Sequence, residues 1–215
     1  DATVAEDDKN ELLRLVRLRQ SPQNRDAVED AISRLSEATK NLPKYRKPIK
    51  NGVWRLLWSS PTAAANPLST PDLVLLGKTY QVVSGNRAVN LVVWGDTKAY
   101  MKSPRLIGGA SLTRVSQDRT RLTVDSFVLK IPNFLELPLF NVTQKVGLEL
   151  QDAAKGQSRV TNKNSDVLKL LYNDGQLRVT QGEESQLIYV HTFEGDDSEI
   201  LEDSTIKASL SLSSS

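Results

Sequence analysis

Hydrophobic residues recur at helical spacing before about residue 50 and at strand spacing after it. Leu12 and Leu15 share one face of a first helix, for which Asp8 is the expected N-cap. Ser21-Pro22 should end that helix and open a second one over about residues 24–40, whose apolar positions again share a face. We therefore expect residues 1–50 to form a helical arm and linker.

Beyond residue 50 the pattern changes to short runs rich in Val, Leu, Thr and aromatic residues, separated by turn residues such as Ser84-Gly85-Asn86 and Asn173-Asp174-Gly175. These runs predict an antiparallel meander. The expected strands lie near Val53–Ser59, Lys78–Val83, Ala88–Trp94, Ile107–Val115, Arg121–Ile131, Val146–Leu150, Val167–Tyr172, Gln176–Thr180 and Gln186–Phe193.

Closing such a meander removes the unpaired edges that an open sheet would expose. We expect a mainly β fold, an antiparallel lipocalin-like barrel of about eight or nine strands over residues 51–193, and a barrel of that size can hold one small ligand. Residues 194–215 are acidic and then rich in Ser, so we expect a disordered tail. Ile206, Leu210 and Leu212 could alternatively add a weak strand.

Composition narrows the possible functions. The 28 Lys and Arg nearly balance the 26 Asp and Glu, so no strong field attracts nucleic acid. The chain has no Cys and a single histidine, His191, which argues against a metal site and most acid–base chemistry. No phosphate-binding glycine loop or serine-nucleophile motif occurs. We expect no catalytic residues, no metal, no cofactor and no enzymatic activity.

Two segments carry a family resemblance. Asn51-Gly52-Val53-Trp54 follows the helical arm, and Asn173-Asp174-Gly175-Gln176-Leu177-Arg178-Val179-Thr180-Gln181-Gly182 precedes the apolar run Gln186–Val190. Together they resemble the opening and closing segments of the plastid lipid-associated protein (PAP)/fibrillin family, over about residues 10–193. Asn173, Gln181 and Trp58-Ser59 depart from the usual pattern of that family.

The resemblance implies a plastid protein of thylakoids or plastoglobules, or of cyanobacterial thylakoids, with any leader already removed. It implies non-catalytic binding or sequestration of an apolar small molecule (a lipid, carotenoid or prenylquinone) at a membrane or lipid-globule surface, in a structural or photoprotective role. The alternative is a protein-interaction module with a side-chain-filled barrel. Such a module would dock a thylakoid complex or a prenyl-lipid biosynthetic enzyme.

Strand alternation selects candidate residues for the barrel interior. Ordinary core packing and direct ligand contact both remain open for them, and a structural role is favoured for His191. Arg178 could stack on Trp54 and close the barrel, or it could be solvated. The candidate interior residues are Trp54, Leu56, Trp58, Tyr80, Val82, Leu91, Val93, Leu122, Val124, Leu187 and Tyr189.

The apolar segment 131–140 contains two prolines, which exclude a regular central strand. We expect it to form a lid over the barrel mouth or a loop that dips into a membrane, or alternatively to pack on the barrel core. The residues proposed for lid or membrane contact are Phe134, Leu135, Leu137, Leu139 and Phe140.

Overall fold

The computed structural model describes residues 2–18, 21–60, 77–95, 97–133, 135–138, 165–196 and 198–212. In chain order its elements are α1 (Ala2–Leu15), α2 (Pro22–Thr39), η1 (Pro43–Tyr45), β1 (Gly52–Ser59), β2 (Gly77–Ser84), β3 (Arg87–Trp94), η2 (Thr97–Lys102), β4 (Arg105–Arg114), β5 (Arg119–Ile131), β6 (Leu135–Pro138), β7 (Ser165–Asn173), β8 (Leu177–Gly182), β9 (Ile188–Gly195), α5 (Ser198–Glu202) and α6 (Ser204–Ser211).

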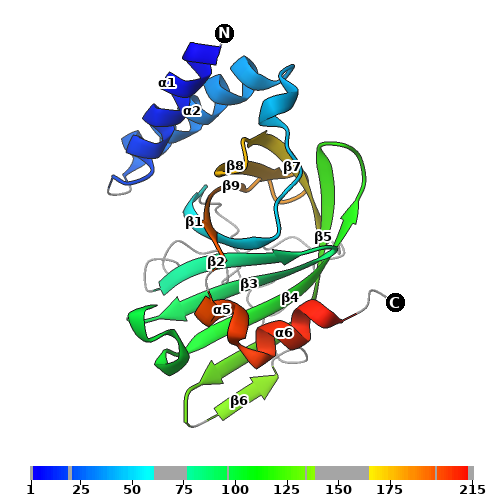
Figure 1. The fold of residues 1–215 in the computed structure, drawn as a ribbon. Coiled ribbons are helices and arrows are strands. Elements are labelled where there is room, and N and C mark those ends of the chain that lie inside the picture. The colour runs from blue at the N-terminus through cyan, green and yellow to red at the C-terminus, as the bar shows by residue number, and fades with distance from the viewer. Residues whose placement is uncertain are drawn as a thin grey trace, which may run out of the picture.

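The strands form one antiparallel sheet that closes on itself into a ring (Figure 1). Its order is β4-β3-β2-β1-β9-β8-β7-β5, and β5 pairs in turn with β4. The first part of β5 pairs with β7 and its last residues pair with β6, which extends the sheet beside the ring. The sequence prediction of a mainly β, antiparallel, barrel-like fold behind short N-terminal helices is confirmed.

The N-terminal helices pack on the outside of the ring. Pro22 lies in the first turn of α2 as expected. Ser21 caps this helix, because its hydroxyl accepts a hydrogen bond from the Asn24 amide at 3.1 Å. The expected start of the first helix was wrong: α1 begins at Ala2, and Asp8 lies within it and binds Arg34 of α2. The apolar faces of α1 and α2 are buried against the outer side of β1, β7, β8 and β9, in a cluster that includes Leu12, Leu15, Val28, Ile32, Leu35, Trp58, Tyr172, Leu177, Val179 and Val190.

The expected disorder of the tail is also wrong for residues 198–212. Two short helices, α5 and α6, lie there on the outer side of β3 and β4 (Figure 1). Ile206 is fully buried in a second cluster with Val89 and Leu91 of β3, and Leu210 packs at its margin. The acidic and Ser-rich composition conceals a helical pattern, since Ile206 and Leu210 are one turn apart behind the N-cap Asp203.

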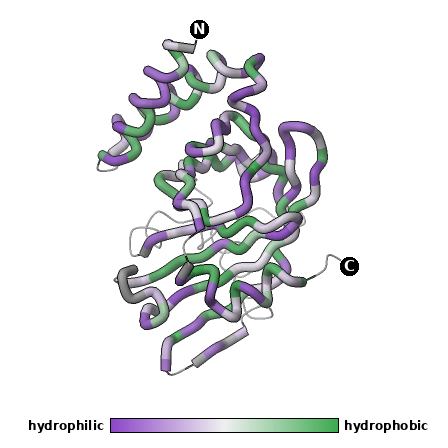
Figure 2. The backbone as a smooth tube through the Cα atoms, in the orientation of Figure 1, coloured by the Kyte–Doolittle hydropathy of each residue, from purple (hydrophilic) through white to green (hydrophobic). Residues whose placement is uncertain are grey.

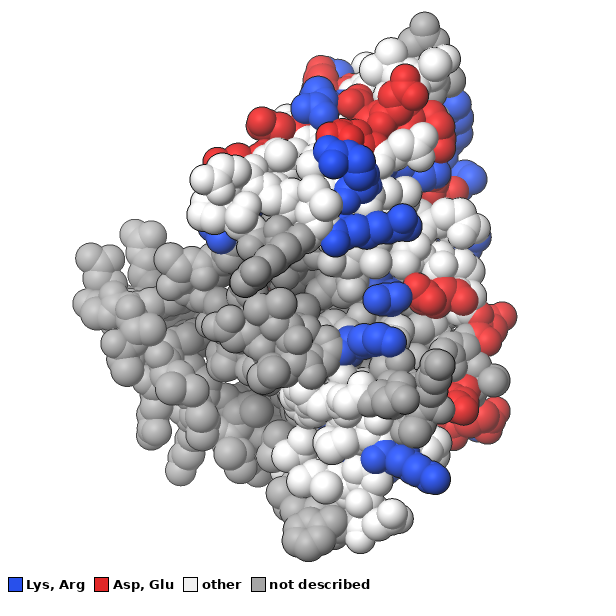
Figure 3. Space-filling model, turned by 90° about the vertical axis from the view of Figure 1, so that its left-hand side faces the viewer, with Lys and Arg blue, Asp and Glu red and all other residues white. Residues whose placement is uncertain are grey.

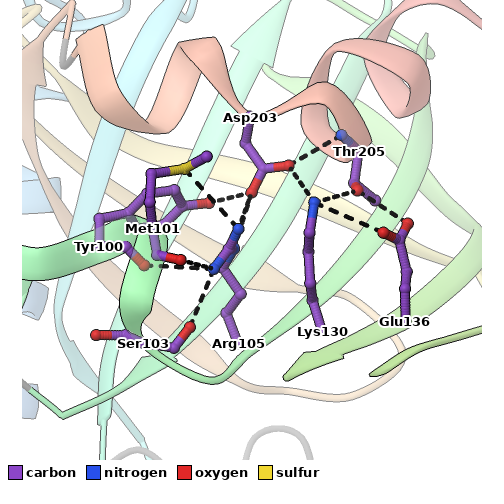
Figure 4. A network of polar contacts seen from close by, with 8 residues as sticks. All are labelled: Tyr100, Met101, Ser103, Arg105, Lys130, Glu136, Asp203 and Thr205. Carbon is purple, nitrogen blue, oxygen red and sulfur yellow. Dashed lines mark hydrogen bonds and ion pairs between the residues drawn. The ribbon is translucent and has the colours of Figure 1, made fainter. Parts of the chain in front are cut away.

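A buried polar network fastens these helices to the ring (Figure 4). The Asp203 carboxylate accepts hydrogen bonds from Arg105 of β4 at 2.8 Å, from the Tyr100 hydroxyl at 3.1 Å and from Lys130 of β5 at 3.3 Å. It also caps α6 by accepting a hydrogen bond from the Thr205 amide at 2.9 Å. One buried carboxylate therefore ties α6 to two strands that lie far away in the sequence.

Hydrophobic and hydrophilic stretches are mixed along the strands and helices (Figure 2). On the face shown in Figure 3, acidic and basic side chains are interspersed over the N-terminal helices at the top of the view. That mixture agrees with the net charge of +2. The described part of this face therefore shows no broad surface of one sign.

Candidate functional site inside the ring

The strand register defines an inner and an outer face of the ring. Residues directly opposite each other in antiparallel strands point to the same side of the sheet. Trp54 lies opposite Gln81 of β2 and Phe193 of β9, whereas the residues beside it in sequence belong to the other side. Both helix pairs cover that other side. Since a ring of about eight strands has room inside only for side chains or one small ligand, Trp54 faces inward.

The same register carries this inner face around the ring. Gln81 lies opposite Asn90 of β3, Asn90 opposite Gly108 of β4, and Gly108 opposite Phe127 of β5. The inner face combines aromatic, aliphatic and uncharged polar side chains with Arg178 and with Asp166 of β7, which lies opposite Leu122. Its members include Trp54, Leu56, Thr79, Gln81, Asn90, Val124, Phe127, Arg178, Thr180, Tyr189, His191 and Phe193.

Arg178 stacks on Trp54, as the sequence suggested. Its guanidinium carbon lies 4.7 Å from the centre of the indole ring, which is within the range of a cation–π interaction. Arg178 Nη2 donates to Gln81 Oε1 at 2.7 Å, and Gln81 Nε2 donates to Asn90 Oδ1 at 2.9 Å. The alternative of a solvated Arg178 is wrong, because only 1% of the side chain is exposed.

Trp54 anchors this group to one end of the ring. Its indole N–H donates to the Lys50 carbonyl at 3.0 Å, and its ring meets Phe193 edge-on with centroids 5.0 Å apart. Trp54 and Arg178 lie near the starts of β1 and β8, the two strands that flank β9, so they occupy the same end of the ring. The contacts of Trp54 and Arg178 thus connect β1, β2, β8 and β9 across that end.

Several polar atoms of the inner face are buried and have no hydrogen-bond partner within the described part of the chain. They are Arg178 Nε and Nη1, His191 Nδ1 and Thr79 Oγ1. Burial lowers the pKa of Arg178 to about 9, so it stays protonated near neutral pH. Burial, assisted by the nearby charge of Arg178, lowers the pKa of His191 well below its usual value, so the imidazole is neutral. Near Arg178, the inner face therefore combines a positive charge with several polar atoms that have no partner among the described residues.

The site favours binding over acid–base chemistry. Burial, together with the negative charge of Asp166, raises the pKa of Tyr189 to about 12, so its hydroxyl keeps its proton. The described residues contain no group of three or more His, Asp or Glu side chains that could hold a metal ion. The inner face can offer a bound molecule apolar surface and hydrogen-bond donors.

Five of the candidate interior residues point outward, so that part of the prediction was wrong. Trp58 lies opposite Val190, because a bulge after Leu56 turns the end of β1 over, and it packs under α1 and α2. The others belong to β2 and β3 and pack in or against the outer cluster beneath α5 and α6. They are Tyr80, Val82, Leu91 and Val93.

The register agrees with the sequence for several other candidates. Leu56 lies opposite His191 and Tyr189 opposite Thr180, and Leu122 and Val124 share the inner side of β5. Leu187 is buried just before β9. Sequence reasoning missed Thr79, Gln81, Asn90, Phe127 and Phe193, which only the pairing of their strands with β1, β4 and β8 could have revealed.

The expected lid lies mostly outside the described residues. This holds for Phe134, Leu139, Phe140 and the strand expected at 146–150. The backbone of residues 135–138 forms β6, which pairs with the end of β5, while nothing is described of the side chains of Leu135 and Leu137. β6 is the last strand in the sheet order, and Pro138 is its last described residue. An edge strand tolerates proline.

None of the helices in the described ranges has the length and apolar character needed to span a membrane. Comparison with curated proteins and with solved structures gave no match. A family model, PAP_fibrillin, matches residues 9–191, a range that includes α1, α2 and all the ring strands up to His191 of β9. Because this match covers most of the chain, the protein belongs to the PAP/fibrillin family of plastid lipid-associated proteins.

Proposed function

We propose that this protein binds and sequesters an apolar molecule, such as a lipid, carotenoid or prenylquinone, inside its ring without chemical turnover. The proposal rests on a difference between the outer and the inner face of the ring. Both helix pairs pack on the outer face and bury its apolar side chains. Trp54, Phe127 and Phe193 point the other way, into the ring.

Burial of apolar surface would supply most of the affinity. Each Å² of apolar surface removed from water contributes roughly 25 cal/mol, so a long hydrocarbon or polyene chain along this wall gains substantially. Trp54 and Arg178 would close one end of the ring, in the latch role expected from the sequence. The ligand would then enter at the other end, where β1 ends at Ser59 and β5 continues into β6.

Contact with a membrane is the second part of the proposal. Of the apolar segment 131–140, the structure describes the backbone of β6, which pairs with the end of β5 at the proposed entrance. We propose Phe134, Leu135, Leu137, Leu139 and Phe140 as the lid or membrane contact that the sequence predicts. A lid or membrane-dipping segment there would let an apolar molecule pass from a thylakoid or plastoglobule into the ring without crossing water. We propose those surfaces as the place of action within the plastid.

The alternative is a docking module for a thylakoid complex or a prenyl-lipid enzyme. Its most direct surface would be the leucine-rich side of α1, but Leu12 and Leu15 are buried against the ring. Arg178, Trp54 and Gln81 contact one another at one end of the ring. These contacts favour the docking module, because they occupy space that a ligand would otherwise fill. A ring filled by its own side chains would bind no ligand, so ligand binding separates the two proposals.

Two single-tryptophan variants test where an apolar molecule binds. Trp58→Phe with Trp94→Phe keeps only the inward Trp54, and Trp54→Phe with Trp94→Phe keeps only Trp58, which lies beneath the N-terminal helices. A decyl-substituted benzoquinone quenches fluorescence at close approach. We expect saturable quenching of Trp54 at about one quinone per chain, with much weaker quenching of Trp58. Equal quenching of both, or quenching without saturation, would indicate surface association.

A further inference from the structure

Arg178 differs from the other buried arginines in its partners. Among the described residues, three arginines are buried: Arg87, Arg105 and Arg178. Arg87 pairs with the carboxylate of Asp125, and Arg105 pairs with Asp203 at 2.8 Å. Arg178 makes no ion pair with any described carboxylate; its guanidinium meets the ring of Trp54 and the amide oxygen of Gln81.

A buried charge without a partner of opposite sign is unfavourable, and so are buried donors without acceptors. Arg178 shows both features, since its Nε and Nη1 find no hydrogen-bond partner among the residues that the structure describes. His191, which lies opposite Arg178 in the register, is 7% exposed, and its Nδ1 likewise has no partner in the described ranges. The free atoms of Arg178, His191 and Thr79 all belong to the inner face, where a ligand's head group would meet them.

We propose that Arg178 is the head-group site of the ring and that its ligand is an amphiphile with a carboxylate head, a long-chain fatty acid. This inference rests on the proposed function, because the acyl chain would lie along the apolar inner wall. A carotenoid or quinone is neutral and would leave the arginine charge unpaired. A carboxylate supplies both the opposite charge and acceptor oxygens. Hydrogen bonds between a guanidinium and a carboxylate are strengthened by the two charges.

Gln81 offers a nearly isosteric test. The Gln81→Glu variant places a carboxylate where the amide oxygen already accepts from Arg178 at 2.7 Å. The amide of Asn90 can turn round to donate its N–H group to the new oxygen, since amide orientations follow the hydrogen-bond network. The variant gives Arg178 an internal ion partner, so we expect a higher Tm and weaker binding of an acidic ligand.

The experiment compares cis-parinaric acid, a fluorescent fatty acid, with its alcohol, which has the same chain and no charge. Binding is measured near neutral pH for the wild-type chain, Arg178→Met and Gln81→Glu, after circular dichroism and Tm show that each is folded. We expect the wild type to bind the acid at least about tenfold more tightly than the alcohol. In both variants the ratio of the two affinities should fall to about one, because the acid no longer gains an ion pair that the alcohol cannot form.

Three results would overturn the inference. Equal wild-type affinity for acid and alcohol would mean that Arg178 recognises no carboxylate, and it would leave the proposed binding of apolar molecules intact. A preference for the acid that survives in both variants would place the recognition elsewhere on the chain. Failure of the wild type to bind either probe would count against both the head-group site and the proposed function.

Discussion

Replacing Asp203 with alanine is expected to lower the free energy of unfolding by about 3–5 kcal/mol, the range for breaking a buried ion pair by removing one partner. Asp203 is fully buried, and its loss leaves the buried guanidinium of Arg105 without its carboxylate. The same substitution removes the N-cap of α6. The effect should be large because one side chain serves both roles.

Urea unfolding followed by circular dichroism measures this loss. The control is Glu202→Ala, which removes the neighbouring carboxylate but breaks only an exposed pair with Lys207. Such pairs contribute about 0–1 kcal/mol, so the control should change little. In Asp203→Ala, amide hydrogen exchange should also speed up over residues 198–211. Equal losses in the two variants would contradict the role assigned to the network in Figure 4.

His191 is expected to make the fold less stable in mild acid. Its pKa in the folded protein lies well below the usual 6.5, because burial and then Arg178 disfavour the charged imidazole. Below pH 6.5 the unfolded chain binds a proton that the folded chain does not, so stability falls as the pH falls. The loss is about 1.4 kcal/mol per pH unit until the pH approaches the folded pKa.

The His191→Gln variant isolates this contribution, since the chain has no other histidine. Between about pH 7.5 and 5.5 the wild type should lose on the order of 1 kcal/mol more than the variant. Titration of carboxylates at lower pH affects both proteins alike and cancels in the comparison. Urea unfolding at the two pH values provides the measurement. Equal losses would show that the imidazole is protonated in the folded state and has access to water or to a carboxylate.

The antiparallel ring could be predicted from the sequence because the turns and strands that build it have local sequence signals. The turn residues at Ser84–Asn86 and at Asn173–Gly175 mark hairpins between strands that do pair. The stacking of Arg178 on Trp54 was also accessible, since both residues belong to the segments that resemble the family. These features depend on short stretches of chain and need no knowledge of what covers each face.

For the strands that helices cover, the sequence could not tell which side chains point into the ring and which point outward. A strand covered on both sides reads as a continuous apolar run, as Leu91–Trp94 does, and alternation then cannot tell inside from outside. The bulge after Leu56 reverses the facing of Trp58 without any mark in the sequence. The packing of α5 and α6 on β3 and β4 was likewise hidden, because Asp203 meets Arg105 only after the whole ring has formed.

Native mass spectrometry, with organic extraction of the protein purified from its natural host, tests the central claim most directly. We expect one class of apolar or amphiphilic molecule to co-purify at about one per chain, as a ring of this size can hold one small ligand. Extraction should release the molecule and native spectra should show its mass on the intact chain. Chains that carry no such molecule and instead co-purify with other polypeptides would contradict ligand binding and favour the docking module.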